Sequence, residues 1–157
     1  MLNSSGQAMN EQALLNKVLK GDEEAINLMN DLAMVSQVWD DLIDRDKPVD
    51  NRMINEAFLA LLYCLPRNDF YTQNITELQP VIDSAMIDWF TANELEQCKG
   101  SEIWDSHEKP MAWCLRDSLA SVLICCAKII GGMDWAISVS LEIRRFVHDE
   151  AIEDYMT

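Results

Sequence analysis

The chain has 157 residues, of which 27 are Asp or Glu and 12 are Lys or Arg, so its formal net charge is −15. A surface this acidic repels phosphate backbones and anionic lipid headgroups, which argues against nonspecific binding to nucleic acids or membranes. The length and the hydrophobic content of 49% indicate one globular domain over residues 1–157, with a core that needs no disulfide or structural metal. The charge is compatible with a bound cation or a basic partner protein.

The spacing of apolar residues predicts helices along most of the chain, and only 5 Gly and 4 Pro are present to interrupt them. Residues 1–10 are polar and small, so we expect a loosely ordered start. The expected helices cover residues 11–19, 22–44, 51–65, 78–98, 111–130 and 133–155, with a short element at 70–74 and a polar loop at 100–110. The predicted fold is an all-α, single-domain bundle of about six helices.

Two of these helices are well marked. Asp22 is a favourable N-cap, and the helix after it carries an apolar stripe that ends in Leu42 and Ile43. Residues 119–127 are the most apolar run, but this run is far too short to cross a bilayer. It is therefore expected to be a buried central helix, in which Cys125 and Cys126 are small core residues.

The five cysteines form no CxxC motif, and their number is odd. No basic segment followed by an apolar run occurs in the first ten residues. Both observations favour free thiols in a reducing, cytoplasmic environment.

The sharpest local feature is an aspartate cluster at the end of the second helix. At about 100° per residue, Asp40, Asp41 and Asp44 share one edge of that helix. Asp40 also continues a row of small or apolar residues and is expected to point inward. That row consists of Met29, Ala33 and Ser36. Such carboxylates suit Mg²⁺, which fills its remaining coordination positions with water and phosphate oxygens. Alternatively, the cluster is solvated or paired locally with Arg45 and Lys47.

The segment DDLID at residues 40–44 resembles the DDxxD motif of the class I isoprenoid (terpenoid) synthases. The resemblance implies an all-α, reduced isoprenoid-synthase-like fold, with Asp40, Asp41 and Asp44 holding Mg²⁺ against a substrate diphosphate. A second DDxxD motif is absent, and Met34 and Val38 stand where the NDxxSxxxE motif requires Ser and Glu. The whole sequence, including VWDDLIDRDKPV and LPRNDFY, is also similar to small uncharacterised proteins of tailed bacteriophages. That similarity implies a phage origin and the cytoplasm of the bacterial host.

A second acidic pair, Glu150 and Asp154, lies near the end of the last predicted helix. Both continue its apolar row and would face inward on an unbroken helix. That row is Ala136, Val139, Ile143 and Val147. The pair is expected either to complete a metal site with Asp40 and Asp44 or to be a solvated helix end. Together with Glu153, it also resembles the E-x-x-E and E-x-x-D metal motifs of all-α nucleotide pyrophosphohydrolases.

Substrate phosphate would require basic side chains, because guanidinium groups match phosphate oxygens. Arg116 and Arg144 are the main candidates, with Arg145 and Lys128 as further ones. The alternative for each is an ordinary salt bridge, such as Arg116 to an inward Asp or Arg144 to His148 or a neighbouring acid.

Three functions remain open. The first is a Mg²⁺-dependent site for a diphosphate or another phosphorylated ligand. The second is a noncatalytic phage accessory protein that binds a basic host or virion protein, with DNA mimicry as one form of this. The third is an enzyme that resembles the all-α nucleotide pyrophosphohydrolases. A helical remnant that has lost its ligand would show the same sequence pattern. The sequence therefore does not determine whether the protein is catalytic, what its substrate is or how it oligomerises.

Overall fold

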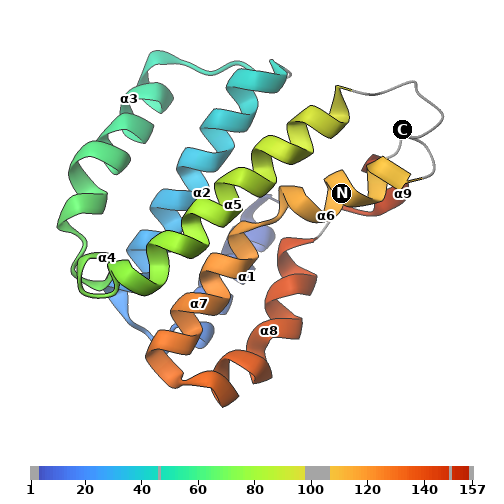
Figure 1. Ribbon diagram of the computed structural model, residues 1–157. Coiled ribbons are helices and arrows are strands. Elements are labelled where there is room, and N and C mark those ends of the chain that lie inside the picture. The colour runs from blue at the N-terminus through green and yellow to red at the C-terminus, as the bar shows by residue number, and fades with distance from the viewer. Residues whose placement is uncertain (1–3, 46, 98–106, 149, 156–157) are drawn as a thin grey trace. The chain divides into compact units, whose positions relative to one another are not determined.

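The computed structural model describes residues 4–45, 47–97, 107–148 and 150–155, and their side chains from residue 11 onward (Figure 1). Every regular element in these ranges is a helix, which confirms the predicted all-α class. None of the helices in these ranges is long and apolar enough to cross a membrane. The chain divides into two compact units, Met1–Ile75 and Thr76–Thr157, and each is described by itself.

Unit 1 contains the helices predicted for the first half of the chain. They are α1 (Ser4–Val18), α2 (Glu23–Asp44), α3 (Asn51–Leu59) and α4 (Asp69–Gln73); α3 continues through a π-helical turn, η1 (Ala60–Cys64), and a 3₁₀ turn, η2 (Leu65–Arg67). The first helix begins at Ser4, within the segment that the sequence predicted to be loosely ordered.

Short polar side chains fix where these helices start. Asp22 accepts a hydrogen bond from the main-chain N–H of Ala25 at 3.0 Å, which confirms the predicted N-cap of α2. Asn68 caps α4, and its side-chain amide also donates to the main-chain oxygen of Glu24 at 2.7 Å. Asn68 therefore ties the start of α4 to the first turn of α2.

The helices of unit 1 that carry most of its buried apolar side chains are α1, α2 and α4. Its buried apolar side chains include Leu14, Leu15, Val18, Leu19, Ala25, Leu28, Met29, Leu32, Val38, Phe70 and Tyr71. The predicted stripe on α2 is correct as far as Val38, but Leu42 and Ile43 are exposed. They lie in the last turn of α2, where Asp41 takes the buried position one turn after Val38.

Unit 2 contains more breaks than the sequence predicted. Its helices are α5 (Ile75–Glu96, whose first residue closes unit 1), α6 (Lys109–Arg116), α7 (Leu119–Gly131), α8 (Met133–Val147) and α9 (Ile152–Tyr155). The helix predicted at 111–130 is interrupted at Asp117 and Ser118, where the Ser118 hydroxyl donates to the main-chain oxygen of Leu115. Such local bonds compete with helix continuation. Of the predicted loop at 100–110, residues 100–106 lie outside the described residues, and α6 already begins at Lys109.

Helices α7 and α8 lie side by side and are joined by a tight corner (Figure 1). Gly132 turns that corner with a φ of +85°, a conformation that glycine adopts without strain. A Cβ on Gly131 would collide with the Trp135 ring, so this position also requires glycine.

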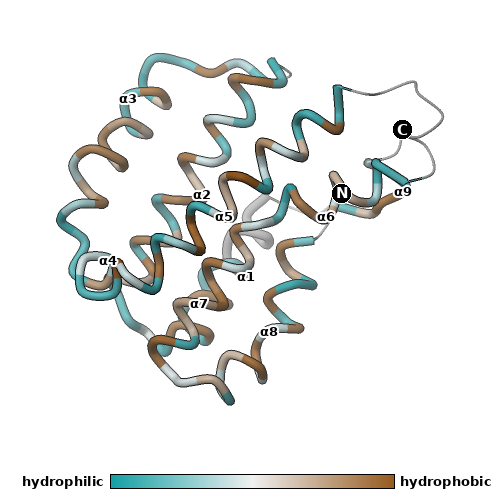
Figure 2. Tube along the Cα trace, viewed as in Figure 1, coloured by the Kyte–Doolittle hydropathy of each residue, from teal (hydrophilic) through white to brown (hydrophobic). Residues whose placement is uncertain are grey.

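Helix α7 is largely hydrophobic in the hydropathy view (Figure 2), and each of its residues is buried or partly buried, in agreement with the predicted buried helix. Cys125 and Cys126 are buried free thiols, and burial raises the pKa of the Cys125 thiol.

Candidate functional site

The aspartate cluster at the end of α2 does not have the predicted geometry. Asp41, rather than Asp40, is the inward carboxylate, with 4% of its surface exposed. Its Oδ1 accepts a hydrogen bond from Gln37 Nε2 at 2.9 Å and lies 3.6 Å from Lys47 Nζ. Asp40 is half-buried, and Asp44 is exposed at the last position of the helix. The inward carboxylate is therefore satisfied by neighbours in sequence, as the alternative interpretation anticipated for Lys47.

Glu150 and Asp154 are both exposed, which agrees with the solvated alternative for this pair and not with the inward one. Helix α8 ends at Val147, where His148 leaves helical geometry with a ψ of 67°. The apolar row of α8 therefore does not continue to Glu150 along one helix. Asp40, Asp41 and Asp44 belong to unit 1, whereas Glu150 and Asp154 belong to unit 2, and their convergence on one metal remains a prediction.

Three of the predicted phosphate ligands contact groups within unit 2. Arg116 Nη1 lies 2.6 Å from Glu96 Oε1, and Arg144 Nη2 donates to Ser121 Oγ at 3.0 Å. Lys128 Nζ lies 2.9 Å from Glu77 Oε2. Arg116 does form a salt bridge, as the alternative predicted. Its partner, however, is a Glu on α5 and not an inward Asp.

A largely buried ion pair of unit 2 is built around Glu96. The side chains of Glu96 and Arg116 are only 12% and 23% exposed, and the Tyr155 hydroxyl donates to the same Glu96 oxygen that Arg116 contacts. Burial and the Glu96 contact raise the pKa of Tyr155 above its usual range. One carboxylate thus joins α5, α6 and the terminal helix α9.

A small apolar cluster lies beside this ion pair. Ala92 and Ala112 are fully buried, and partly buried side chains pack against them: Leu95, Leu115 and Tyr155. Ala92 belongs to α5 and Ala112 to α6, so the cluster joins these two helices. The Glu96 carboxylate is therefore partly shielded from water, which strengthens its interactions with Arg116 and Tyr155.

A second polar group lies where α8 ends. His148 Nδ1 lies 2.6 Å from Asp117 Oδ2 without the alignment of a directed hydrogen bond. The Trp113 ring lies 5.0 Å from the His148 ring, and its Nε1 donates to the main-chain oxygen of Glu150 at 3.1 Å. These contacts explain why α8 ends at Val147. From the sequence, His148 is predicted only as a candidate partner for Arg144.

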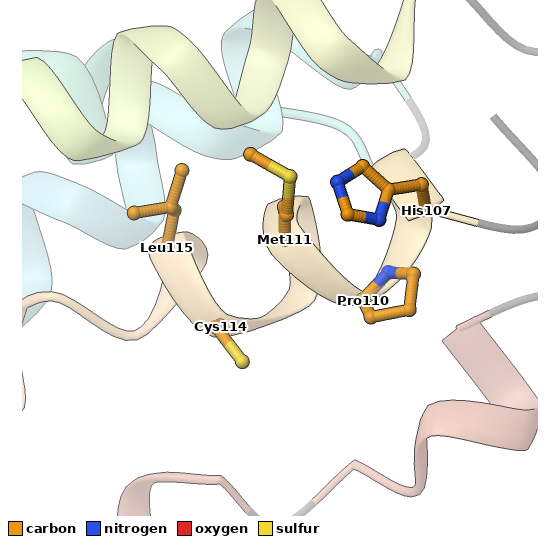
Figure 3. A pocket seen from close by; sticks show the side chains of 5 residues that line it. All are labelled: His107, Pro110, Met111, Cys114 and Leu115. Atoms are coloured by element: carbon orange, nitrogen blue, oxygen red, sulfur yellow. The ribbon is translucent and has the colours of Figure 1, made fainter. Parts of the chain in front are cut away.

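A pocket of about 440 Å³ lies along α6 and the turn before it (Figure 3). Its lining side chains are His107, Pro110, Met111, Cys114 and Leu115. Met111 and Leu115 extend from the same side of α6, and His107 lies beside Met111 (Figure 3). This lining is mostly apolar and contains no carboxylate, so it does not provide ligands for Mg²⁺.

Within the part of the chain that the structure describes, no group of three or more His, Cys, Asp or Glu side chains is placed to hold a metal ion. No protein family, curated protein or solved structure matches the chain. The fold defines an all-α protein of two compact helical units, whose inward carboxylates Asp41 and Glu96 are bound to neighbouring side chains.

Proposed function

We propose that this chain is a noncatalytic, acidic interaction protein that binds a basic partner protein. The observation that carries the proposal is the helix formed by α3 and η1. Unlike an ordinary surface helix, it buries small side chains and exposes large apolar ones. Its buried residues are the small ones, Ala57 and Ala60, and five large side chains are exposed. These exposed residues are Phe58, Leu59, Leu61, Leu62 and Tyr63.

The exposure of this surface is large for a monomer. Leu62 has 72% of its surface exposed and Phe58 has 61%. Contiguous apolar residues at this exposure typically mark an interaction site, because leaving them in water costs free energy that a partner would recover. Figure 2 shows the corresponding hydrophobic stretch along α3.

The charge of the chain selects the class of partner. A net charge of −15 repels acidic proteins and accelerates association with basic ones. Glu96 and Asp41 already have internal partners, so neither of these carboxylates adds support to catalysis. We further propose a phage origin, which the sequence resemblance implies, and with it a host or virion protein as the partner.

The proposal is tested by capture from bacterial lysates on the immobilised protein. Wild type should retain a basic protein at about 0.05 M salt and release it at about 0.5 M, because screening shortens the range of the attraction. The variant Leu62→Ser should retain less of that protein. Leu42→Ser is the matched control, since it alters an exposed leucine of the same unit outside α3 and η1. Failure to capture any basic protein from several hosts would contradict the proposal.

A further inference from the structure

The exposed side of α8 carries a ridge of large apolar residues. Met133, Ile137 and Leu141 have 61%, 65% and 58% of their surfaces exposed. They recur every four residues, so they form one row along the helix, and the exposed Arg145 occupies the next position of that row. Asp134 lies beside the start of the row and is also exposed. The ridge therefore has a negative charge at one end and a positive charge at the other.

Contacts on the other side of α8 hold the helix in place. Ala136, Val139 and Ile143 are buried, and α7 packs along the helix (Figure 1). The Arg144 guanidinium also donates to the Ser121 hydroxyl of α7 at 3.0 Å. The exposed ridge thus has a fixed direction, which lowers the ordering cost of binding.

The charge around the ridge differs from that of the chain as a whole. Helix α8 contains two acidic and two basic residues, whereas α5 contains five acidic residues and no basic one. The charged residues of α8 are Asp134, Glu142, Arg144 and Arg145. At physiological salt, charges separated by more than about 8 Å are largely screened. Two copies of this acidic chain can therefore meet at α8 without the repulsion that α5 would cause.

The two ends of the ridge complement each other when two copies of α8 run antiparallel. With a two-fold axis at the level of residue 139, Ile137 of one copy lies opposite Leu141 of the other. The same axis brings Asp134 of each copy to Arg145 of the other, within about one residue along the helix. A parallel pair would instead place Asp134 against Asp134 and Arg145 against Arg145. The apolar residues and the charges thus favour the same antiparallel arrangement.

We propose that the chain forms a two-fold homodimer in which two copies of this α8 ridge pack antiparallel. The occupant is a second copy, because its α8 carries the apolar residues and the opposite charges at the required spacing. The dimer does not depend on the proposed function, since the surface formed by α3 and η1 belongs to the other unit of the chain. A helix of 15 residues is about 22 Å long and offers less area than a standard interface, so we expect a dissociation constant in the micromolar range.

Analytical ultracentrifugation of the full chain tests the dimer, from about 1 to 500 μM protein in about 0.15 M salt. The mass should rise with concentration from the monomer value of 18.0 kDa towards that of a dimer. Ile137→Ser and Leu141→Ser should each weaken dimerisation by about tenfold or more, because each removes a central apolar contact from both halves of the interface. Ile87→Ser on α5 and Leu62→Ser on η1 are the matched controls, at side chains that are 64% and 72% exposed, and should dimerise like wild type.

Charge reversal tests the antiparallel arrangement. Asp134→Arg gives the ridge a positive charge at both ends, and Arg145→Asp gives it a negative charge at both ends. Each variant alone should dimerise about tenfold more weakly than wild type, because like charges then meet. An equimolar mixture of the two should form a heterodimer about as tight as the wild-type dimer, since opposite charges meet again at both ends. Thermal unfolding shows whether each variant is folded, and mixing would not reverse a loss caused by misfolding.

Three results would overturn the proposed dimer. A wild-type mass that stays at 18.0 kDa at the highest concentration rejects it outright. Weakening by Ile87→Ser or Leu62→Ser as large as that by Ile137→Ser places the contact on another surface. A mixture of the two charge variants that stays monomeric rejects the pairing of Asp134 with Arg145. These results leave the proposed function standing, and failure to capture a basic protein from lysate leaves the dimer standing.

Discussion

The carboxylates of Asp41 and Glu96 differ in how far along the chain their partners lie. Asp41 is satisfied by Gln37 and Lys47, which lie within one or two turns of chain. Glu96 is instead satisfied by Arg116 and Tyr155, which come from two other helices. The first group forms a conspicuous sequence motif and makes only local contacts. The second group has no sequence motif, yet it joins three helices. A conspicuous motif is therefore no guide to which residues stabilise the fold.

The largest effect should follow from removing Glu96. The variant Glu96→Ala leaves the Arg116 guanidinium without its carboxylate and the Tyr155 hydroxyl without its acceptor. We expect the free energy of unfolding to fall by about 2–3 kcal/mol, as measured by urea denaturation. Glu150→Ala is the control, because the Glu150 side chain is exposed, and it should change stability by less than about 0.5 kcal/mol. Equal effects would contradict the contrast between buried and exposed carboxylates.

Removing the Tyr155 hydroxyl should have the next largest effect. Tyr155→Phe loses the bond to Glu96 but keeps the Arg116 ion pair, so we expect a loss of about 1–1.5 kcal/mol at pH 7. The pKa of Tyr155 is raised in the folded state, so the stability from its protonated form is complete below the unfolded tyrosine pKa of about 10 and is lost as the pH rises further.

The difference between wild type and Tyr155→Phe should therefore shrink above about pH 10. Urea denaturation at a series of pH values from neutral to alkaline would measure it. A difference that stays constant over the whole series would show that the Tyr155 hydroxyl does not contribute through its protonated form.

Neutralising Asp41 should cost less. In Asp41→Asn the side chain can still accept from Gln37, and Lys47 is 62% exposed, so its ion pair is largely screened by solvent. We expect a loss below about 1 kcal/mol, and it should diminish as salt is added. Asp44→Asn is the matched control at an exposed position of the same helix. If Asp41→Asn lowered the free energy of unfolding as much as Glu96→Ala, the Asp41 and Glu96 groups would not differ in their contribution to stability.

The smallest expected effect concerns the predicted metal site. Because Asp41 is bonded to Gln37 and Lys47, we expect Mg²⁺ with pyrophosphate to shift the thermal midpoint by less than about 1 °C. Differential scanning fluorimetry would measure the shift. An increase of several degrees that Asp41→Asn abolishes would instead support the DDxxD hypothesis.

The sequence predicted what depends on local chemistry. Asp22 was identified as a cap because a short carboxylate can reach the N–H groups of the next turn. The run at 119–127 was identified as buried because few polar residues interrupt it. Leu42 and Ile43 were placed wrongly because periodicity does not show how far a neighbouring helix covers the last turn of α2.

The Glu96 group could not be predicted in the same way. Arg116 was noted as a candidate ligand, but its partner depends on how α5 and α6 pack through Ala92 and Ala112. Tyr155 has a role only because the chain leaves helical geometry at His148 and starts a new short helix at Ile152. Such breaks arise from contacts between residues distant in sequence, here His148 with Asp117.

The π-helical turn at Ala60–Cys64 is a position where the chain can gain or lose one residue without losing the helix. A π turn contains one residue more than the α-helical turn it replaces, so a single-residue deletion there would restore regular α-helical geometry. The residues before the turn would then rotate by about 100° relative to those after it. Insertion or deletion of one residue can therefore re-orient Phe58 and Leu59 against the following chain, so relatives could differ in the shape of this surface while keeping the helix.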